Sequence, residues 1–147
     1  MAMFDQSALR VAFRTKLNTL VGLPDGAQRA WENQSFVPTS NVRWMEELLA
    51  ISFEEKTTTG NIEAQGFITY TLFEPIGVGT ESIEAVAKIL AEGFEAGQSL
   101  VNGGLQAILE HTERLNGRDK TKRDGNLSLW YAIPVVIHWR VFTATSP

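Results

Sequence analysis

The segment that most constrains the fold is the apolar stretch LSLWYAIPVVIHWRVF, residues 127–142. Every second residue from Leu127 to Val141 is apolar or aromatic, and a period of two is the period of a β-strand. The opposite face carries Trp130 and Phe142 among polar residues. A strand that is apolar along one whole face needs a covering layer, so this chain must form a sheet packed against something else.

Four other segments have strand character. Residues 62–73 alternate cleanly between two faces, and the polar stretch before them predicts the tip of an antiparallel hairpin at 53–62. The remaining strand candidates are residues 28–33, 41–53 and 105–111. Pro134 lies inside the apolar strand, and because proline has no N–H donor it indicates an edge position or a bulge.

Two segments have the period of an amphipathic helix. Asp5 and Thr80 are their predicted N-caps, and Arg10 and Arg14 on the first helix are expected to face water. The apolar stripes are Leu9, Ala12, Phe13, Leu17 and Leu20 in the first helix, and Ile83, Val86, Ala87, Leu90 and Phe94 in the second. The order of elements predicts one α+β domain over residues 1–147. It is a single antiparallel or mixed β-sheet of about five strands with two α-helices packed on one face.

Few residues suggest chemistry. The chain has no cysteine, and its net charge of −4 argues against a dedicated nucleic-acid binder. The two histidines, His111 and His138, lie in separate strand candidates without metal spacing, which favours structural or surface roles. Glu46 and Glu47 are neighbours in a strand, so they point to opposite faces, and both are expected to be solvated. We predict no enzyme, no catalytic residue, no cofactor and no metal site.

The segment RAWENQSFVPTSNVRW, residues 29–44, is the first candidate for binding. Aromatic side chains bracket a polar, proline-containing stretch, and buried aromatic residues serve both cores and interfaces. The segment is therefore either a hydrophobic clip within its own fold or a contact to a neighbouring subunit. The predicted interface residues are Trp31, Glu32, Asn33, Phe36, Pro38 and Trp44.

The second candidate is the charged segment 114–126. It contains almost no apolar residue and is bounded by glycines, which predicts a mobile basic loop. Such a loop can order against an acidic surface or a nucleic-acid backbone. Its basic residues are Arg114, Arg118, Lys120, Lys122 and Arg123.

The order of these motifs resembles the tail terminator proteins of long-tailed, non-contractile phages. Two short motifs carry the resemblance, one in the aromatic loop and one in the final strand. The matching residues are Ala30, Trp31, Glu32, Asn33, Phe36 and Pro38, then Tyr131, Ile133, Pro134, Val135, Ile137 and Trp139. The irregular stretch Trp44–Glu47 departs from the regular apolar strand that we expect in this family.

The resemblance implies a structural virion protein that is no enzyme. Such subunits form a homo-oligomer, a hexameric ring that caps the tail tube and stops its polymerisation. The subunit is expected to be monomeric when dilute. The implied partners are the tail tube protein and the head–tail connector protein, with no membrane, and DNA only as cargo passing the lumen. The implied location is the virion tail, after assembly in the bacterial host cytoplasm. Two alternatives stay open: a small-ligand-binding or enzymatic α+β domain, and another head–tail neck component.

Overall fold

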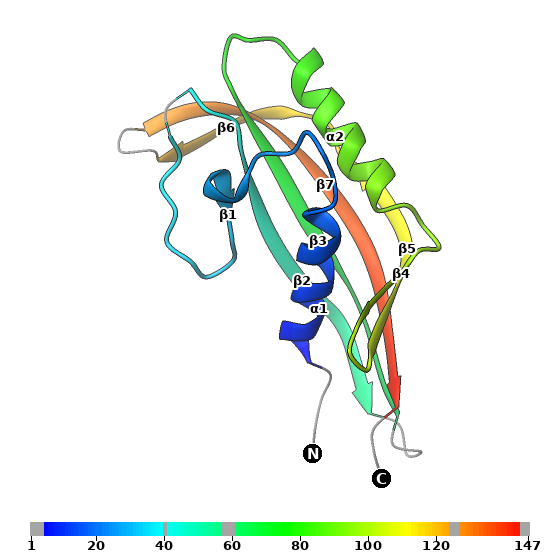
Figure 1. The fold of residues 1–147 in the computed structure, drawn as a ribbon. Coiled ribbons are helices and arrows are strands. Elements are labelled where there is room, and N and C mark those ends of the chain that lie inside the picture. Colours follow the sequence, from blue (N-terminus) through cyan, green and yellow to red (C-terminus); the bar gives the residue numbers. More distant parts are fainter. Residues whose placement is uncertain (1–4, 40, 57–60, 124–126, 145–147) are drawn as a thin grey trace.

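A computed structural model describes residues 5–39, 41–56, 61–123 and 127–144. They form one curved sheet with both helices on the same face, which confirms the predicted α+β class (Figure 1). The helices are α1 (Gln6–Leu17) and α2 (Glu81–Gly93), with a short 3₁₀ turn η1 (Gly26–Gln28). The strands are β1 (Arg29–Ala30), β2 (Trp44–Lys56), β3 (Asn61–Pro75), β4 (Ser99–Asn102), β5 (Leu105–Arg114), β6 (Arg118–Arg123) and β7 (Leu127–Ala144).

The sheet is mixed and has seven strands in the described residues, somewhat more than the expected five. The strand order is β1-β2-β3-β7-β5-β4, and only the short β1–β2 pair is parallel. Strand β6 also pairs with β7. Ala132 of β7 pairs with Phe73 of β3 and with Arg118 of β6. A strand has two edges, so β6 must lie on the side of β7 away from β3, in line with β5.

The predicted alternation on the two long central strands is confirmed. The even-numbered residues of β3 from 62 to 72 are all buried, and they face the helices together with the odd-numbered residues 133 to 141 of β7. Paired residues in an antiparallel ladder share a face, so Ile68 opposite Ile137 and Tyr70 opposite Val135 build one continuous apolar layer. This layer and the helices form the main core.

Both helices lie where the periodicity predicts them. The Asp5 carboxylate accepts a hydrogen bond from the Ala8 N–H at 3.1 Å and so caps α1. Leu20 lies beyond the helix but still packs on the core. In α2 the four stripe residues from Ile83 to Leu90 and the following Phe94 are buried. Thr80 takes the cap position, but its side chain makes no capping hydrogen bond.

Gly66 marks a point where β2 and β3 approach closely. The register between β2 and β3 shifts between Ile51 and Phe53 beside it. A Cβ atom on Gly66 would collide with the carbonyl oxygen of Ala50 and would lie 2.7 Å from Cζ2 of Trp139. Only glycine therefore allows the ladder, the bulge and the indole to coexist.

One strand was missed and two expectations were wrong. Strand β4 was not expected, and Arg118–Arg123 forms strand β6 in place of the predicted loop. The backbone groups of β7 beyond the end of β5 need partners, and β6 supplies them despite its polar sequence. Pro134 lies neither at an edge nor at a bulge of β7. It faces the break between β5 and β6, where its carbonyl accepts the Leu115 N–H at 2.9 Å.

Candidate interaction surface

The segment between β1 and β2, described at residues 31–39 and 41–43, wraps around the β2 edge of the sheet. Trp31 packs against the main core on the helix side. Phe36 packs on the opposite side, against a second, smaller cluster. Asn33 and Asn41 have φ angles of 61° and 63°, a left-handed conformation that asparagine tolerates better than most residues. We call this segment the edge loop.

Glu32 fixes the first part of the edge loop. Its Oε1 atom accepts hydrogen bonds from Arg10 at 3.1 Å and from the backbone N–H of Leu49 at 2.8 Å. The carboxylate thus satisfies an edge N–H of β2 that lies beyond the β1–β2 pairs at Met45 and Glu46. Burial raises the pKa of Glu32, but the hydrogen bonds from Arg10 and Leu49 outweigh it and hold the pKa below its usual value.

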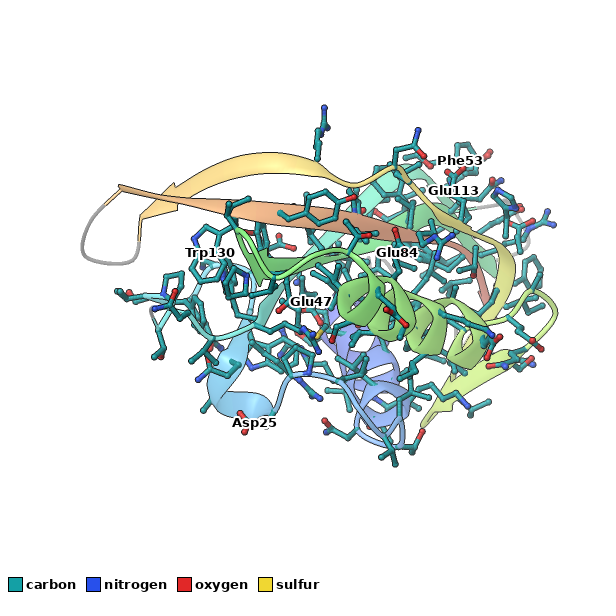
Figure 2. The ribbon with its side chains drawn as sticks, turned by 90° about the horizontal axis from the view of Figure 1, so that it is seen from above. Asp25, Glu47, Phe53, Glu84, Glu113 and Trp130 are labelled. Atoms are coloured by element: carbon teal, nitrogen blue, oxygen red, sulfur yellow. The ribbon has the colours of Figure 1, made fainter. Side chains whose placement is uncertain are left out.

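A buried carboxylate lies behind this edge. Glu47 is only 2% exposed and sits between the sheet and the helices (Figure 2). Arg14 of α1 donates to it at 2.7 Å, Arg10 lies at 3.8 Å, and the Tyr70 hydroxyl donates at 3.4 Å. The Arg14 guanidinium also stacks over Trp31, 4.3 Å from the ring centroid. Burial, and then the Glu47 charge, raise the pKa of Tyr70 well above its usual value.

The second cluster lies on the sheet face away from the helices. Trp44 stacks on Phe73 with ring centroids 4.0 Å apart and meets Trp130 edge-on at 6.0 Å. Phe36 covers Trp44 at 5.2 Å, so the edge loop shields this cluster from water. The clip interpretation of the loop therefore accounts for the inner faces of Trp31 and Phe36.

An ion pair fixes the far end of the edge loop. Arg43 donates to the buried carboxylate of Glu74, at the end of β3, with Nε 2.7 Å from Oε2. Its Nη2 atom donates to the hydroxyl of Ser82 at the start of α2. The edge loop is thus held by side-chain pairs at both of its ends.

Between the edge loop and β2 lies an open cavity of about 340 Å³. Three aromatic residues line it, Trp31, Phe36 and Trp44. Three carboxylates, from Glu32, Glu46 and Glu47, line it as well. Glu32 and Glu47 are already paired with Arg10 and Arg14, while the aromatic rings are surfaces on which a cationic side chain, above all a guanidinium, can stack.

The structure brings all six predicted interface residues together around this cavity. Trp44 and Pro38 are buried, Trp31, Glu32 and Phe36 are half-buried, and Asn33 is exposed. Trp44 and Pro38 are thus enclosed within the single chain. The remaining four residues keep part of their surface exposed.

The predicted basic segment is split between two elements. Arg114 ends β5 and Arg118 begins β6, and both side chains are exposed. The backbone of Lys120, Lys122 and Arg123 belongs to β6, while their side chains lie outside the described part of the chain. Strand β6 and the start of β7 project beyond the body of the molecule (Figure 2).

The two histidines, separate in the sequence, meet across the sheet. A register shift in β5 pairs His111 with His138, and their ring centroids are 5.4 Å apart. Glu113 lies 3.3 Å from His138 Nε2 and 3.8 Å from His111 Nε2. Across the described residues, no group of three or more histidine, cysteine, aspartate or glutamate side chains is arranged to hold a metal ion.

The sequence interpretation was wrong about the surroundings of three residues at this site. Arg10 and Arg14 were expected to face water and instead form ion pairs, and Glu47 was expected to be solvated and is buried. A signal was present, because Glu47 alternates with Met45 and Leu49 and so shares their buried face. A carboxylate on an apolar face requires a cationic partner.

The described residues define an α+β fold with one mixed sheet, two helices on one face and an open cavity at the β2 edge. A family model described as "Phage tail terminator protein" matches residues 8–139. The chain belongs to this phage tail terminator family, whose members are structural proteins of the phage tail. Membership also implies a place in the virion.

Solved structures confirm the fold. Eight chains of known structure match this protein. One of them, whose name states no function, is 19% identical with a TM-score of 0.69, and the match covers 98% of this chain and 99% of that one. The comparison with curated proteins finds no match. None of the described helices has the length and apolar character needed to span a membrane.

Proposed function

We propose that this protein completes the phage tail by closing its tube. Copies of the chain assemble into a hexameric ring on the tube end, stop further polymerisation and offer a joining surface to the head–tail connector. The observation that carries the proposal is the family match over residues 8–139. The subunit acts by binding and has no catalytic step.

Two features of the chain support this role. A closed ring needs two different patches on each subunit, and this sheet presents different structures at its two sides, the edge loop beside β2 and the basic strand β6 beyond β7. The net charge of −4 suits a wall past which DNA moves, since a basic lumen would retain phosphates. The ring is proposed to form in the host cytoplasm and to remain in the virion.

The edge loop is the proposed contact surface. Side-chain pairs at both ends, Glu32 with Arg10 and Arg43 with Glu74, hold it in one shape before any partner arrives. A preordered loop loses little conformational entropy on binding, which favours assembly. Exposed Asn33 and half-buried Phe36 provide the polar rim and the aromatic anchor of an interface.

Electron microscopy of tube ends tests the proposal. Purified protein is mixed with tubes polymerised from the tail tube protein of the same phage. We expect a density with rotational symmetry at one end of each tube, and no elongation from that end when more tube protein is added. Tubes that elongate from bare ends at every protein concentration would contradict the proposal. Binding only to tubes that are already capped would assign the protein to the neck.

A further inference from the structure

One row of residues crosses the sheet at a single height. Trp44 pairs with Phe73, Phe73 pairs with Ala132, and Ala132 pairs with Arg118. Directly paired residues in an antiparallel ladder share a face. Trp44 and Arg118 therefore stand at the two ends of one row, on the sheet face away from the helices.

The Trp44 end of this row is acidic and aromatic. The edge-loop cavity opens here, and Glu46, two residues further along β2, lines it on the same face as Trp44. Phe36 forms another wall. A carboxylate beside aromatic rings is the environment that best holds an arginine side chain, through paired hydrogen bonds and stacking.

The Arg118 end of the row is basic. The sequence of β6 has four basic residues and one acidic residue, in a chain whose net charge is −4. Within the described residues, no strand other than β7 pairs with β6. The exposed Arg118 side chain and the outer backbone edge of β6 are thus available for a contact.

These complementary ends cannot meet within one chain. Three strand spacings of about 4.8 Å, roughly 14 Å in total, separate β2 from β6 along the row. That gap exceeds the reach of an arginine side chain. A second copy can bring the two ends together, and because the patches differ, the contact is heterologous and runs head to tail.

We infer that the edge-loop cavity of one copy receives Arg118 of the next copy. Glu46 and the aromatic walls hold the guanidinium, and the two ends of the row define the polarity of the assembly. This inference rests on the proposed function, in which copies assemble, and adds the contact surfaces and the side chain that joins them. Since the contact joins unlike charges, added salt weakens it.

Cysteine cross-linking tests the contact directly, because the chain has no cysteine of its own. One variant carries Asn33→Cys at the cavity and another carries Asn116→Cys beside β6, both at exposed positions. We expect a disulfide-linked dimer when the two variants are mixed under assembling conditions. Neither variant alone should cross-link, and Lys88→Cys on the exposed side of α2 should not cross-link with either. Links only between identical variants would overturn the head-to-tail contact.

Charge exchange tests the named residues. Arg118→Glu and Glu46→Arg should each raise the protein concentration at half-assembly by about tenfold or more, and the double variant should recover most of that loss. Glu46→Gln serves as a gentler variant for comparison. Circular dichroism spectra check that every variant is folded. Single variants that assemble like the wild type, or a double variant no better than either, would overturn the inference.

The two proposals fail in different ways. If the wild type caps tubes but shows no cross-link between the Asn33 and Asn116 positions, this contact is wrong and the terminator role stands. If the wild type neither self-associates nor binds tube ends, the proposed function is wrong, and this inference falls with it.

Discussion

The guanidinium of Arg14 on α1 lies 2.7 Å from the carboxylate of Glu47 on β2, and the Glu47 side chain is 1% exposed. This pair joins a helix to the sheet behind the edge loop, and Trp31 packs on the same guanidinium. A buried carboxylate is tolerated only because its charge is balanced. The shape of the edge loop therefore depends on an ion pair that lies beneath it.

Removing Arg14 should strongly destabilise the fold. Arg14→Ala leaves Glu47 buried with only the more distant Arg10, and we expect the free energy of unfolding to fall by about 3 kcal/mol. This value is at the lower end for buried pairs because the Arg14 side chain is 29% exposed. Urea denaturation measures the change. Arg140→Ala, which breaks the exposed pair with Glu63, is the control and should have little effect. Equal losses for both variants would refute the role of burial.

Tyr70 should make the protein sensitive to alkali. Its folded pKa is raised, so its stabilising contribution is complete below the unfolded pKa of about 10 and is lost as pH rises beyond it toward the folded pKa. Over that window the loss approaches about 1.4 kcal/mol per pH unit for one group. Tyr70→Phe cannot ionise, so its stability should decline less steeply above pH 10. Parallel stability curves for the two proteins would show that Tyr70 ionises freely in the fold.

Gly66 should not accept a side chain. Gly66→Ala places a methyl group against the Ala50 carbonyl and the Trp139 ring, and the strain should cost about 3 kcal/mol. Thermal unfolding gives the comparison. The control is Gly26→Ala, because a Cβ there meets no atom within 4 Å. If Gly66→Ala has the same melting temperature as Gly26→Ala, the strands separate more easily than the geometry indicates.

Phe36 separates the two roles of the edge loop. Phe36→Ser removes the cover of Trp44, and since Phe36 is only half-buried, we expect a loss of about 2 kcal/mol in a protein that still folds. Tube-end binding should be lost as well. Val37→Ser changes the neighbouring residue, which is 69% exposed, and should leave stability unchanged. A destabilised Phe36→Ser protein that still caps tubes at low temperature would make the loop a core clip only.

Much of this fold could be predicted because the residues of a long strand alternate regularly between a buried and an exposed face. The alternation in β3 and β7 identified their buried faces residue by residue, and the stripe from Leu9 to Leu17 identified α1. Strand β6 gave no such signal, since its pairing comes from the backbone needs of β7 and its side chains are polar. Local hydrophobic patterns therefore identify helices and strands that bury an apolar face. They miss a strand whose main role is to supply backbone hydrogen bonds to its neighbour.

The site was only partly predictable, for a related reason. The aromatic residues of the edge loop stood out by their type, and the structure brings them around one cavity. Their ionic supports depend on which helix residue faces which strand residue, as for Arg14 and Glu47, 33 positions apart. The pairing of His111 with His138 depends on a register shift at residues 109–111. Neither the register nor the helix placement can be predicted from composition or period.

The central claim is that this protein ends the growth of the tail tube, and tail length tests it most directly. Phage particles are produced with the gene intact, with the gene deleted, and with the gene restored on a plasmid, and tube lengths are measured by electron microscopy. Our account predicts uniform tails in the first and third cases. In the second it predicts headless tubes of widely varying, excessive length. Tubes of normal, uniform length in the deletion would contradict the account.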